Sequence, residues 1–437
     1  MTTYTQAIDY IYDLTKYGIK LGLKNINYLL YLLGEPHKKL KIIHVAGTNG
    51  KGSTCSLISS ILQSDGYKVG LYTSPHLVDF TERIKINKKP INRKKVCELL
   101  ERIKPYIEKV ANTHSYGHPT FFEVVTSLAF LYFYEEKVDF LVLEVGLGGR
   151  LDATNVCEPL VSVITHVDYD HMDKLGNSLE EIAREKGGII KTGGIIISSK
   201  QYNEAYKEIK KIADEKNSII YSADKEINYE IVKSDIKGVI FDLKGIYNEY
   251  KTLHTPLLGR HQADNAATAI TAIEALKIKG VNITEKAIRD GLEKVKWTGR
   301  LEIIQNNPTL VLDGAHNPSG VKVVRDALKE IFTYQRLILV LAIFADKDYK
   351  KMIKILAPNA DLIIATKTKN PRAVSPQTIA EEAAQYMNQD KIIVTEDIPQ
   401  AIKCALSNSN KNDLICITGS LYTVGEAKKY FESKEYK

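Results

Sequence analysis

The stretch that decides the fold is His44-Val45-Ala46-Gly47-Thr48-Asn49-Gly50-Lys51-Gly52-Ser53-Thr54. An apolar, β-branched run at 42–46 leads into its glycines and predicts a buried strand, and a helix is expected to begin near Lys51. A glycine-rich loop between a strand and a helix N-terminus turns several backbone N–H groups toward an anion. The stretch therefore predicts a phosphate-binding loop of an ATP-using enzyme. The alternative is a glycine-rich turn with no ligand.

The loop departs from the common nucleotide-binding pattern G-x-x-x-x-G-K-[ST] at two places. Gly52 separates Lys51 from Ser53, and residue 45 is a valine where the pattern has glycine. Lys51 is still expected to bridge the terminal phosphates, with a hydroxyl of Ser53 or Thr54 near the phosphates or a metal. On its own the loop indicates a nucleotide, so a GTPase switch or a transport ATPase would also fit.

Apolar strand runs alternate with helical stretches along most of the chain. Such strands form parallel sheets that are covered on both faces, so the predicted fold class is α/β. The expected strands of a first sheet lie at 42–46, 69–73, 140–145, 161–165 and 195–198. Those of a second sheet lie at 310–312, 337–342, 362–365, 392–395 and 414–418. Between the two sets, 229–243 alternates apolar and polar residues and predicts an antiparallel hairpin at a sheet edge, with Lys237-Gly238 as its turn.

A chain of 437 residues is expected to form two domains, because single cores stop growing near about 250–300 residues. We place the boundary at Trp297-Thr298-Gly299-Arg300, which gives domains of 1–296 and 297–437. The N-terminus lacks a secretory h-region, and the longest apolar run, 337–345, is too short to span a bilayer. Five cysteines without a CxxC pair favour a reducing compartment and argue against disulfides and a zinc site. A cytoplasmic location is expected.

The net charge of +7 comes from lysines scattered over the expected helix faces. Most of them are expected to be solvated surface charges, with mild steering of an anionic substrate as the functional alternative. No basic block is interleaved with aromatic residues, so no nucleic-acid partner is expected. No membrane partner is expected either.

Polar side chains follow several of the expected strands of the first sheet. Ser74 follows 69–73, Glu144 ends 140–145, and Asp168, Asp170 and His171 follow 161–165. Ligands of parallel α/β sheets bind at the carboxyl ends of strands. Carboxylate and hydroxyl groups near a γ-phosphate suit Mg²⁺, which keeps several waters and takes few protein ligands. A bare lysine such as Lys186, in contrast, reads as a surface charge.

A series of motifs, in order along the chain, resembles the folylpolyglutamate synthase/dihydrofolate synthase family of Mur-type amide ligases. The resemblance runs from about residue 19 to residue 426, and the extra Gly52 is normal for this group. The motifs are HVAGTNGKGS (44–53), TSPHL (73–77), ERI (82–84), FFE (121–123), EVGLGGRLDATN (144–155), DH (170–171), EK (185–186), GRHQ with NA (259–266), WTGRLE (297–302), DGAHNP (313–318) and GSLY (419–422).

The resemblance implies a P-loop domain of the Mur central type, with a mostly parallel sheet and helices on both faces, followed by a smaller Rossmann-like glutamate ligase domain. It implies that ATP lies between the two domains and that domain closure assembles the site. The implied ATP contacts are Thr48, Asn49, Gly50, Lys51, Gly52, Ser53, Asn265, Arg300, Asp313 and His316. The implied metal ligands for two Mg²⁺ ions are Ser74, Glu144, His171 and Lys186, of which Lys186 is expected to be carbamylated. The implied pterin-substrate contacts are Phe122, Leu151, Asp152 and Ala153.

The reaction of the family supplies the expected chemistry. ATP phosphorylates a substrate carboxylate to an acyl phosphate, which the amine of L-glutamate attacks with loss of phosphate. Such chemistry depends on neutralising the transferring phosphoryl group, so Lys51, Lys186 and His171 are the expected catalytic residues. The expected partners are small molecules: a folate or dihydropteroate, L-glutamate and ATP. We expect a monomer.

Two other functions remain as alternatives at this point. A Mur-type ligase acting on a cell-wall precursor is disfavoured by FFE and by GGRLDATN, which belong to the folate branch. A nucleotide-dependent switch or binding module is disfavoured by DGAHNP in a second α/β domain. The stretch 18–23 resembles an N-terminal loop that touches pterin in bifunctional members, and it is too short to choose between acceptors.

Overall fold

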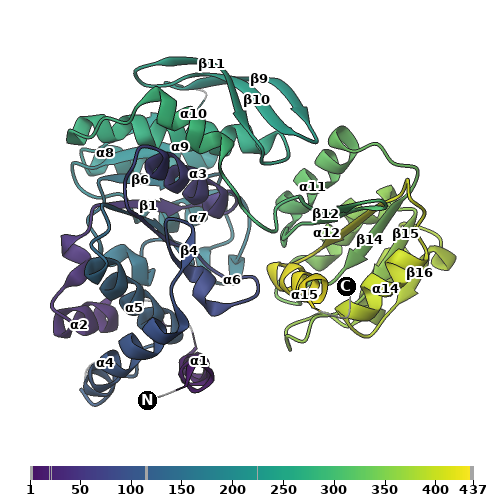
Figure 1. Cartoon of the computed structure of the whole chain (residues 1–437), viewed down its shortest axis with the longest axis horizontal. Coiled ribbons are helices and arrows are strands. Elements are labelled where there is room, and N and C mark those ends of the chain that lie inside the picture. The colour runs from purple at the N-terminus through teal and green to yellow at the C-terminus, as the bar shows by residue number, and fades with distance from the viewer. Residues whose placement is uncertain (1–2, 19, 21, 114–116, 224, 434–437) are drawn as a thin grey trace.

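The computed structural model of the chain describes residues 3–18, 20, 22–113, 117–223 and 225–433, which form two lobes (Figure 1). The larger lobe contains an eight-stranded sheet with the order β4-β3-β2-β5-β1-β6-β7-β8. Strands β2, β5, β1, β6, β7 and β8 run parallel, and β3 and β4 add an antiparallel edge. The bounds are β1 (Ile42–Ala46), β2 (Val69–Tyr72), β3 (Ile84–Ile86), β4 (Lys89–Pro90), β5 (Phe140–Glu144), β6 (Val161–Ile164), β7 (Ile195–Ser198) and β8 (Ile219–Ser222).

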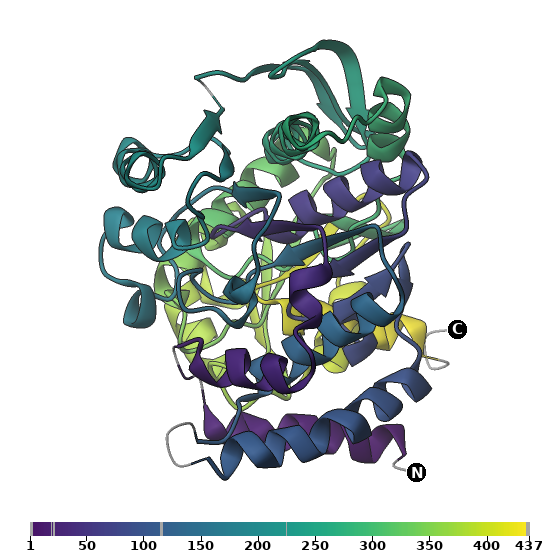
Figure 2. The ribbon, with the colours of Figure 1, turned by 90° about the vertical axis from the view of Figure 1, so that its left-hand side faces the viewer.

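Helices cover both faces of this sheet because successive apolar residues of its strands point to opposite sides. In β1, Ile43 and Val45 pack with α3 (Lys51–Ser64), α9 (His261–Ala275) and α10 (Glu285–Glu293). Ile42 and Ala46 pack on the other face. That face carries α1 (Tyr4–Asp13), α2 (Lys24–Leu32), α4 (Arg93–Ala111), α5 (Phe121–Glu135), α7 (Leu179–Gly187) and α8 (Asn203–Glu215). Figure 2 shows α1, α2 and α4 on the side of the sheet away from α9 and α10.

A small antiparallel sheet covers α9 and α10 in the larger lobe (Figure 1). Its strands are β9 (Asn228–Asp235), β10 (Gly238–Lys244) and β11 (Glu249–Thr255), in the order β11-β10-β9. The hairpin predicted at 229–243 is therefore present as β9 and β10, and β9 forms one edge of this separate three-stranded sheet. Phe241 and Leu253 bury their side chains in the cluster that holds α9, which explains why the hairpin leaves the main sheet and gains a third strand.

The smaller lobe contains a six-stranded sheet with the order β12-β13-β17-β14-β15-β16. Only β12 is antiparallel to its neighbour. The bounds are β12 (Glu302–Asn306), β13 (Thr309–Leu312), β14 (Leu337–Leu341), β15 (Leu362–Ala365), β16 (Ile392–Val394) and β17 (Leu414–Thr418). One face packs on α11 (Pro318–Ile331), α12 (Tyr349–Leu356) and α13 (Pro376–Ala383), and the other packs on α14 (Ile398–Ser407) and α15 (Leu421–Glu432).

The predicted α/β architecture is confirmed, and each predicted strand is present with its ends within one residue. The chain passes from the larger to the smaller sheet between Glu293, where α10 ends, and Glu302, where β12 begins. The predicted boundary after Lys296 lies in this connection. None of the described helices combines the length and the apolar composition that crossing a bilayer requires.

Candidate active site

A cavity of about 350 Å³ opens between the two lobes. Residues that directly follow β1, β2 and β6 line it from the larger lobe, and residues that follow β13 and β17 line it from the smaller lobe. The predicted ATP-binding and metal-binding residues all lie in its wall: Thr48, Asn49, Gly50, Lys51, Gly52, Ser53, Ser74, Glu144, His171, Lys186, Asn265, Arg300, Asp313 and His316. The structure therefore brings these residues together at one place, as ligands of parallel sheets require.

The phosphate loop leaves β1 and ends at Gly50, which has a left-handed φ of 87° and caps α3. The N–H groups of Lys51, Gly52 and Ser53 are in the first turn of α3, where no carbonyl of the helix can accept from them. They are available to an anion, which the helix dipole also favours. The Lys51 ammonium lies over the loop and donates to the carbonyls of Gly47 at 3.1 Å and Thr48 at 3.2 Å.

The additional glycine of the loop, Gly52, has a steric explanation. A Cβ atom at this position would overlap the indole ring of Trp297, which lies in the connection between the lobes. A residue that the sequence marks as a domain boundary thus packs directly on the phosphate loop. The close approach of the ring requires that residue 52 has no side chain.

Glu144 and Ser74 form the acidic side of the cavity. Glu144 ends β5 and is buried, and its Oε2 atom accepts a hydrogen bond of 2.8 Å from the backbone N–H of Ser74. Burial raises the pKa of Glu144, although the nearby Lys51 charge opposes this. The described residues contain no group of three His, Cys, Asp or Glu side chains placed to hold a metal ion. A cation at Glu144 would therefore need phosphate oxygens or water to complete its coordination.

Lys186, in the last turn of α7, is only 4% exposed. Its Nζ atom donates to the Gly47 carbonyl at 2.8 Å, on the same loop as Lys51. Burial, helped by the positive charge of Lys51, lowers the pKa of Lys186 to about 7. Lys186 is thus not the surface charge that a bare lysine suggests. The side chain is a buried amine beside the phosphate loop.

Asp170 connects the two lobes. Its carboxylate forms an ion pair of 2.6 Å with Lys347 of the smaller lobe, and less than a tenth of either side chain is exposed. Asn317 donates to Asp170 at 3.3 Å and to Asn49 of the phosphate loop at 3.1 Å. Burial would raise the pKa of Asp170, but His316 and then Lys347 hold it well below its usual range. The sequence gives no signal for Lys347, because its partner lies 177 positions away.

His171 lies beside this contact. Its Nε2 atom is 3.1 Å from the Nζ atom of Lys347 and 3.9 Å from Asp170. Burial, with the Lys347 charge, lowers the pKa of His171 to about 4, so the imidazole is neutral near pH 7. A neutral imidazole has a lone pair available for a metal or a proton.

Asp313 and Asn265 position the nucleotide side of the cavity. Asp313 follows β13 and accepts from the backbone N–H groups of Leu301 at 2.9 Å and Ala315 at 2.7 Å. Burial raises the pKa of Asp313 against the charge of Arg300. Asn265, on α9, packs so close to Gly50 that a Cβ atom there would overlap its side chain. The loop and α9 therefore share one packed junction.

The four predicted pterin contacts lie outside the wall of the cavity. Asp152 accepts from the N–H groups of Gly146 at 3.1 Å and Leu147 at 2.9 Å, so its carboxylate holds the turn that lines the cavity. The Phe122 ring packs under the same turn, where a Cβ atom on Gly146 would lie 2.5 Å from it. Ala153 is buried, and Leu151 is partly exposed. Asp152 and Phe122 thus contact the turn that lines the cavity and do not line the cavity themselves.

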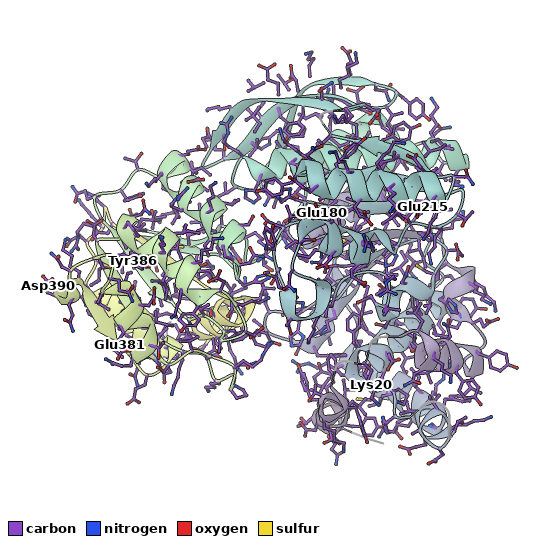
Figure 3. The ribbon with its side chains drawn as sticks, turned by 180° about the vertical axis from the view of Figure 1, so that it is seen from behind. Lys20, Glu180, Glu215, Glu381, Tyr386 and Asp390 are labelled. Carbon is purple, nitrogen blue, oxygen red and sulfur yellow. The ribbon has the colours of Figure 1, made fainter. Side chains whose placement is uncertain are left out.

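The stretch 18–23, which resembles a pterin-contacting loop, is described only in part. Its residues 19 and 21 are outside the described residues. Lys20, labelled in Figure 3, donates to the His118 carbonyl at 3.3 Å and lies 5.7 Å from the ring centre of Tyr17.

The Mur ligase middle domain matches residues 45–273, and the Mur ligase glutamate ligase domain matches 299–421. A dihydrofolate synthase/folylpolyglutamate synthase of Bacillus subtilis is 40% identical over 98% of this chain and 99% of its own length. The chain belongs to the folylpolyglutamate synthase/dihydrofolate synthase family.

Solved structures of this family share the whole architecture. A folylpolyglutamate synthase of Mycobacterium tuberculosis, complexed with ADP and AMPPCP, superposes with a TM-score of 0.91 at 31% identity, over 99% of each chain. An Escherichia coli FolC, in complex with DHPP and ADP, superposes with a TM-score of 0.89 at 29% identity, over 100% of each chain. Both lobes of this family member, and their mutual arrangement, are thus found in relatives that hold a nucleotide.

The contact of Gly52 with Trp297 predicts a measurable coupling. Gly52→Ala is expected to lower the free energy of unfolding by about 1–3 kcal/mol, because overpacking displaces the indole ring. It should also change the fluorescence of Trp297, the single tryptophan of the chain. In a Trp297→Ala background the same substitution should cost clearly less. Equal losses in the two backgrounds, measured by chemical unfolding, would contradict the direct contact.

Proposed function

We propose that the chain is an ATP-dependent amide ligase that adds L-glutamate to the carboxylate of a folate-type acceptor through an acyl phosphate. The observation that carries the proposal is the inter-lobe cavity, whose wall combines the phosphate loop with Glu144, Lys186 and Asp313. The relatives are named as dihydrofolate synthase/folylpolyglutamate synthase and as folylpolyglutamate synthase, which supports the same chemistry here. We propose tetrahydrofolate as the acceptor, with dihydropteroate as a second one, because the Bacillus subtilis relative carries both names.

The phosphates of ATP are assigned to the loop between Thr48 and Ser53. Free N–H groups at the start of α3 bind their oxygens, and Lys51 is free to turn from the loop carbonyls toward the terminal phosphate. Asn265, Arg300, Asp313 and His316 hold the nucleotide from α9 and the smaller lobe.

Ser74 and Glu144 fit a first Mg²⁺. The Glu144 carboxylate is buried, and among the described residues its one hydrogen bond comes from Ser74, so a cation would satisfy its charge. One carboxylate and one hydroxyl suffice for Mg²⁺ when phosphate and water supply its other ligands. Bound there, Mg²⁺ would neutralise phosphate charge during phosphoryl transfer.

His171 and Lys186 fit a second Mg²⁺ only if Lys186 is carbamylated. An ammonium would repel the ion, whereas a carbamate supplies oxygen ligands. The modification requires a deprotonated amine, and a pKa lowered to about 7 provides one near neutral pH. His171 offers its neutral imidazole on the same side of the cavity.

The acceptor ring is assigned to Phe122 and to Leu151, Asp152 and Ala153, which support the turn beneath the cavity. The monomeric state stays a prediction. The cytoplasmic location stays a prediction.

A ligase for cell-wall precursors is disfavoured, since the reported relatives are named for folate ligation over nearly the whole length of this chain. A nucleotide switch is disfavoured by the same names.

Steady-state phosphate release tests the proposed reaction. Phosphate is expected only when ATP, L-glutamate and a pteroyl carboxylate are all present. Lys51→Ala should lower this rate at least about 100-fold, because it removes a charge that stabilises the transferring phosphoryl group. Lys89→Ala, on an exposed edge strand, is the matched control. Near-normal turnover of the Lys51 variant would remove the phosphate-loop assignment.

Lys186 can be tested by isotope labelling. With ¹³C-bicarbonate, a carbamate signal is expected that grows as the pH rises from 6 to 8, because the amine loses its proton near pH 7. Lys186→Ala should lack the signal, should be inactive, and should recover part of its activity with acetate. Full activity of this variant without acetate would exclude Lys186 from the mechanism.

A further inference from the structure

Arg83 is a buried cation of the larger lobe that the assigned chemistry does not use. It ends η3 (Phe80–Arg83), immediately before β3, and is only 6% exposed. Its carbonyl accepts from the N–H of Thr73 at 3.1 Å, the residue directly before the proposed metal ligand Ser74. Arg83 is therefore anchored beside the end of β2, next to the cavity wall.

The guanidinium of Arg83 has no acidic partner among the described residues. Its Nε atom donates to His76 Nδ1 at 2.9 Å, and its centre lies 5.3 Å from the ring centre of Phe121. Since Nδ1 accepts this hydrogen bond, the imidazole is neutral and brings no charge. No carboxylate of the described chain lies within 4.0 Å, and no other described group accepts from its terminal NH₂ groups.

Arg93, in the same region, provides a comparison because its guanidinium has a carboxylate partner. Arg93 lies 4.9 Å from the ring centre of Tyr4, as Arg83 lies over Phe121, but Arg93 also contacts Asp79 at 2.6 Å. The side chain of Arg93 is 66% exposed, so water could solvate its charge even without Asp79. Arg83 is buried and forms no direct ion pair with a described carboxylate, although its charge acts on Glu144 from a distance, and such a charge is costly unless an anion joins it.

Aromatic groups surround Arg83 on the acceptor side of the cavity. Tyr12 stacks on Phe121 with ring centres 5.7 Å apart, and its hydroxyl is 3.1 Å from His76 Nε2. Phe121 directly precedes Phe122, which is assigned to the acceptor ring. Arg83 therefore lies over the neighbour of Phe122 and is hydrogen-bonded to the neighbour of Ser74, where the terminal phosphate and its metal are assigned. The tail of an acceptor that joins these two positions would pass near Arg83.

We propose that Arg83 binds the non-reacting carboxylate of a glutamate-terminated acceptor and so favours folate over pteroate. The inference rests on the proposed function. Dihydropteroate has one carboxyl group, which reacts, whereas tetrahydrofolate ends in glutamate and keeps a second carboxylate that stays charged. A planar guanidinium binds such a carboxylate through two parallel hydrogen bonds. Two basic side chains in the cavity wall already have a carboxylate partner, since Lys347 has Asp170 and Arg372 has Asp346 at 3.6 Å.

The test compares tetrahydrofolate with its mono-amide, in which the reacting carboxyl is free and the other is an amide. The wild-type enzyme is expected to prefer tetrahydrofolate at least about 30-fold in kcat/KM, as for removal of one partner of a buried charge pair. In Arg83→Gln this preference should fall below about threefold, mainly through KM, and Arg83→Lys should restore part of it. Arg93→Gln should keep the wild-type preference.

Dihydropteroate provides the second comparison, since it lacks the carboxylate in question. Its KM should change less than about threefold in Arg83→Gln, and thermal unfolding should show that this variant is folded. Equal losses for tetrahydrofolate, the mono-amide and dihydropteroate would assign Arg83 a purely structural role and overturn the inference, as would an unchanged preference. Failure of the wild-type enzyme to release phosphate with any acceptor would instead overturn the proposed function.

Discussion

The three glycines of the phosphate loop have no room for a Cβ atom, and the neighbouring segments are packed around that constraint. Thr165, from the end of β6, occupies the space that a side chain on Gly47 would need. Asn265 of α9 does the same at Gly50, and Trp297 of the inter-lobe connection does so at Gly52. Three segments far apart in sequence thus meet on a few glycines. The loop that is assigned to the nucleotide is also the junction that orients the lobes.

The polar counterpart of this junction is the buried carboxylate of Asp170. Lys347, His316 and Asn317 of the smaller lobe all contact it, and Asn317 also reaches the loop residue Asn49. Removing one member of a buried charged group leaves the others unpaired at high cost. The two lobes therefore meet through groups that are satisfied only when the lobes are together. Transfer of the γ-phosphoryl group from ATP to an acceptor carboxylate, with residues of both lobes around the reacting groups, requires such an arrangement.

Local patterns predicted the parts of the fold that depend on local structure. The β1-loop-α3 unit and the alternating strands follow from apolar periodicity and glycine placement. The third strand of the small sheet, β11, was not predicted because its polar and charged residues alternate weakly with its buried ones and its partner surface on α9 comes from another segment. Motifs located Glu144, Lys186 and Asp313, and the structure adds that they share a cavity. Contacts that arise from docking, such as Trp297 on Gly52 and Lys347 on Asp170, have no local signal. The sequence likewise could not show that Arg83 lacks a carboxylate partner among the described residues, because that depends on which side chains lie near it in space.

The central claim is that this cavity activates an acceptor carboxylate as an acyl phosphate before amide formation. Oxygen isotope transfer tests it most directly. The acceptor carboxyl group is labelled with ¹⁸O, and the phosphate released during one round of ligation with ATP and L-glutamate is analysed by mass spectrometry. The account predicts one ¹⁸O atom in each released phosphate, because the acceptor oxygen attacks the γ-phosphorus and leaves with it. Unlabelled phosphate, released together with amide product, would contradict it.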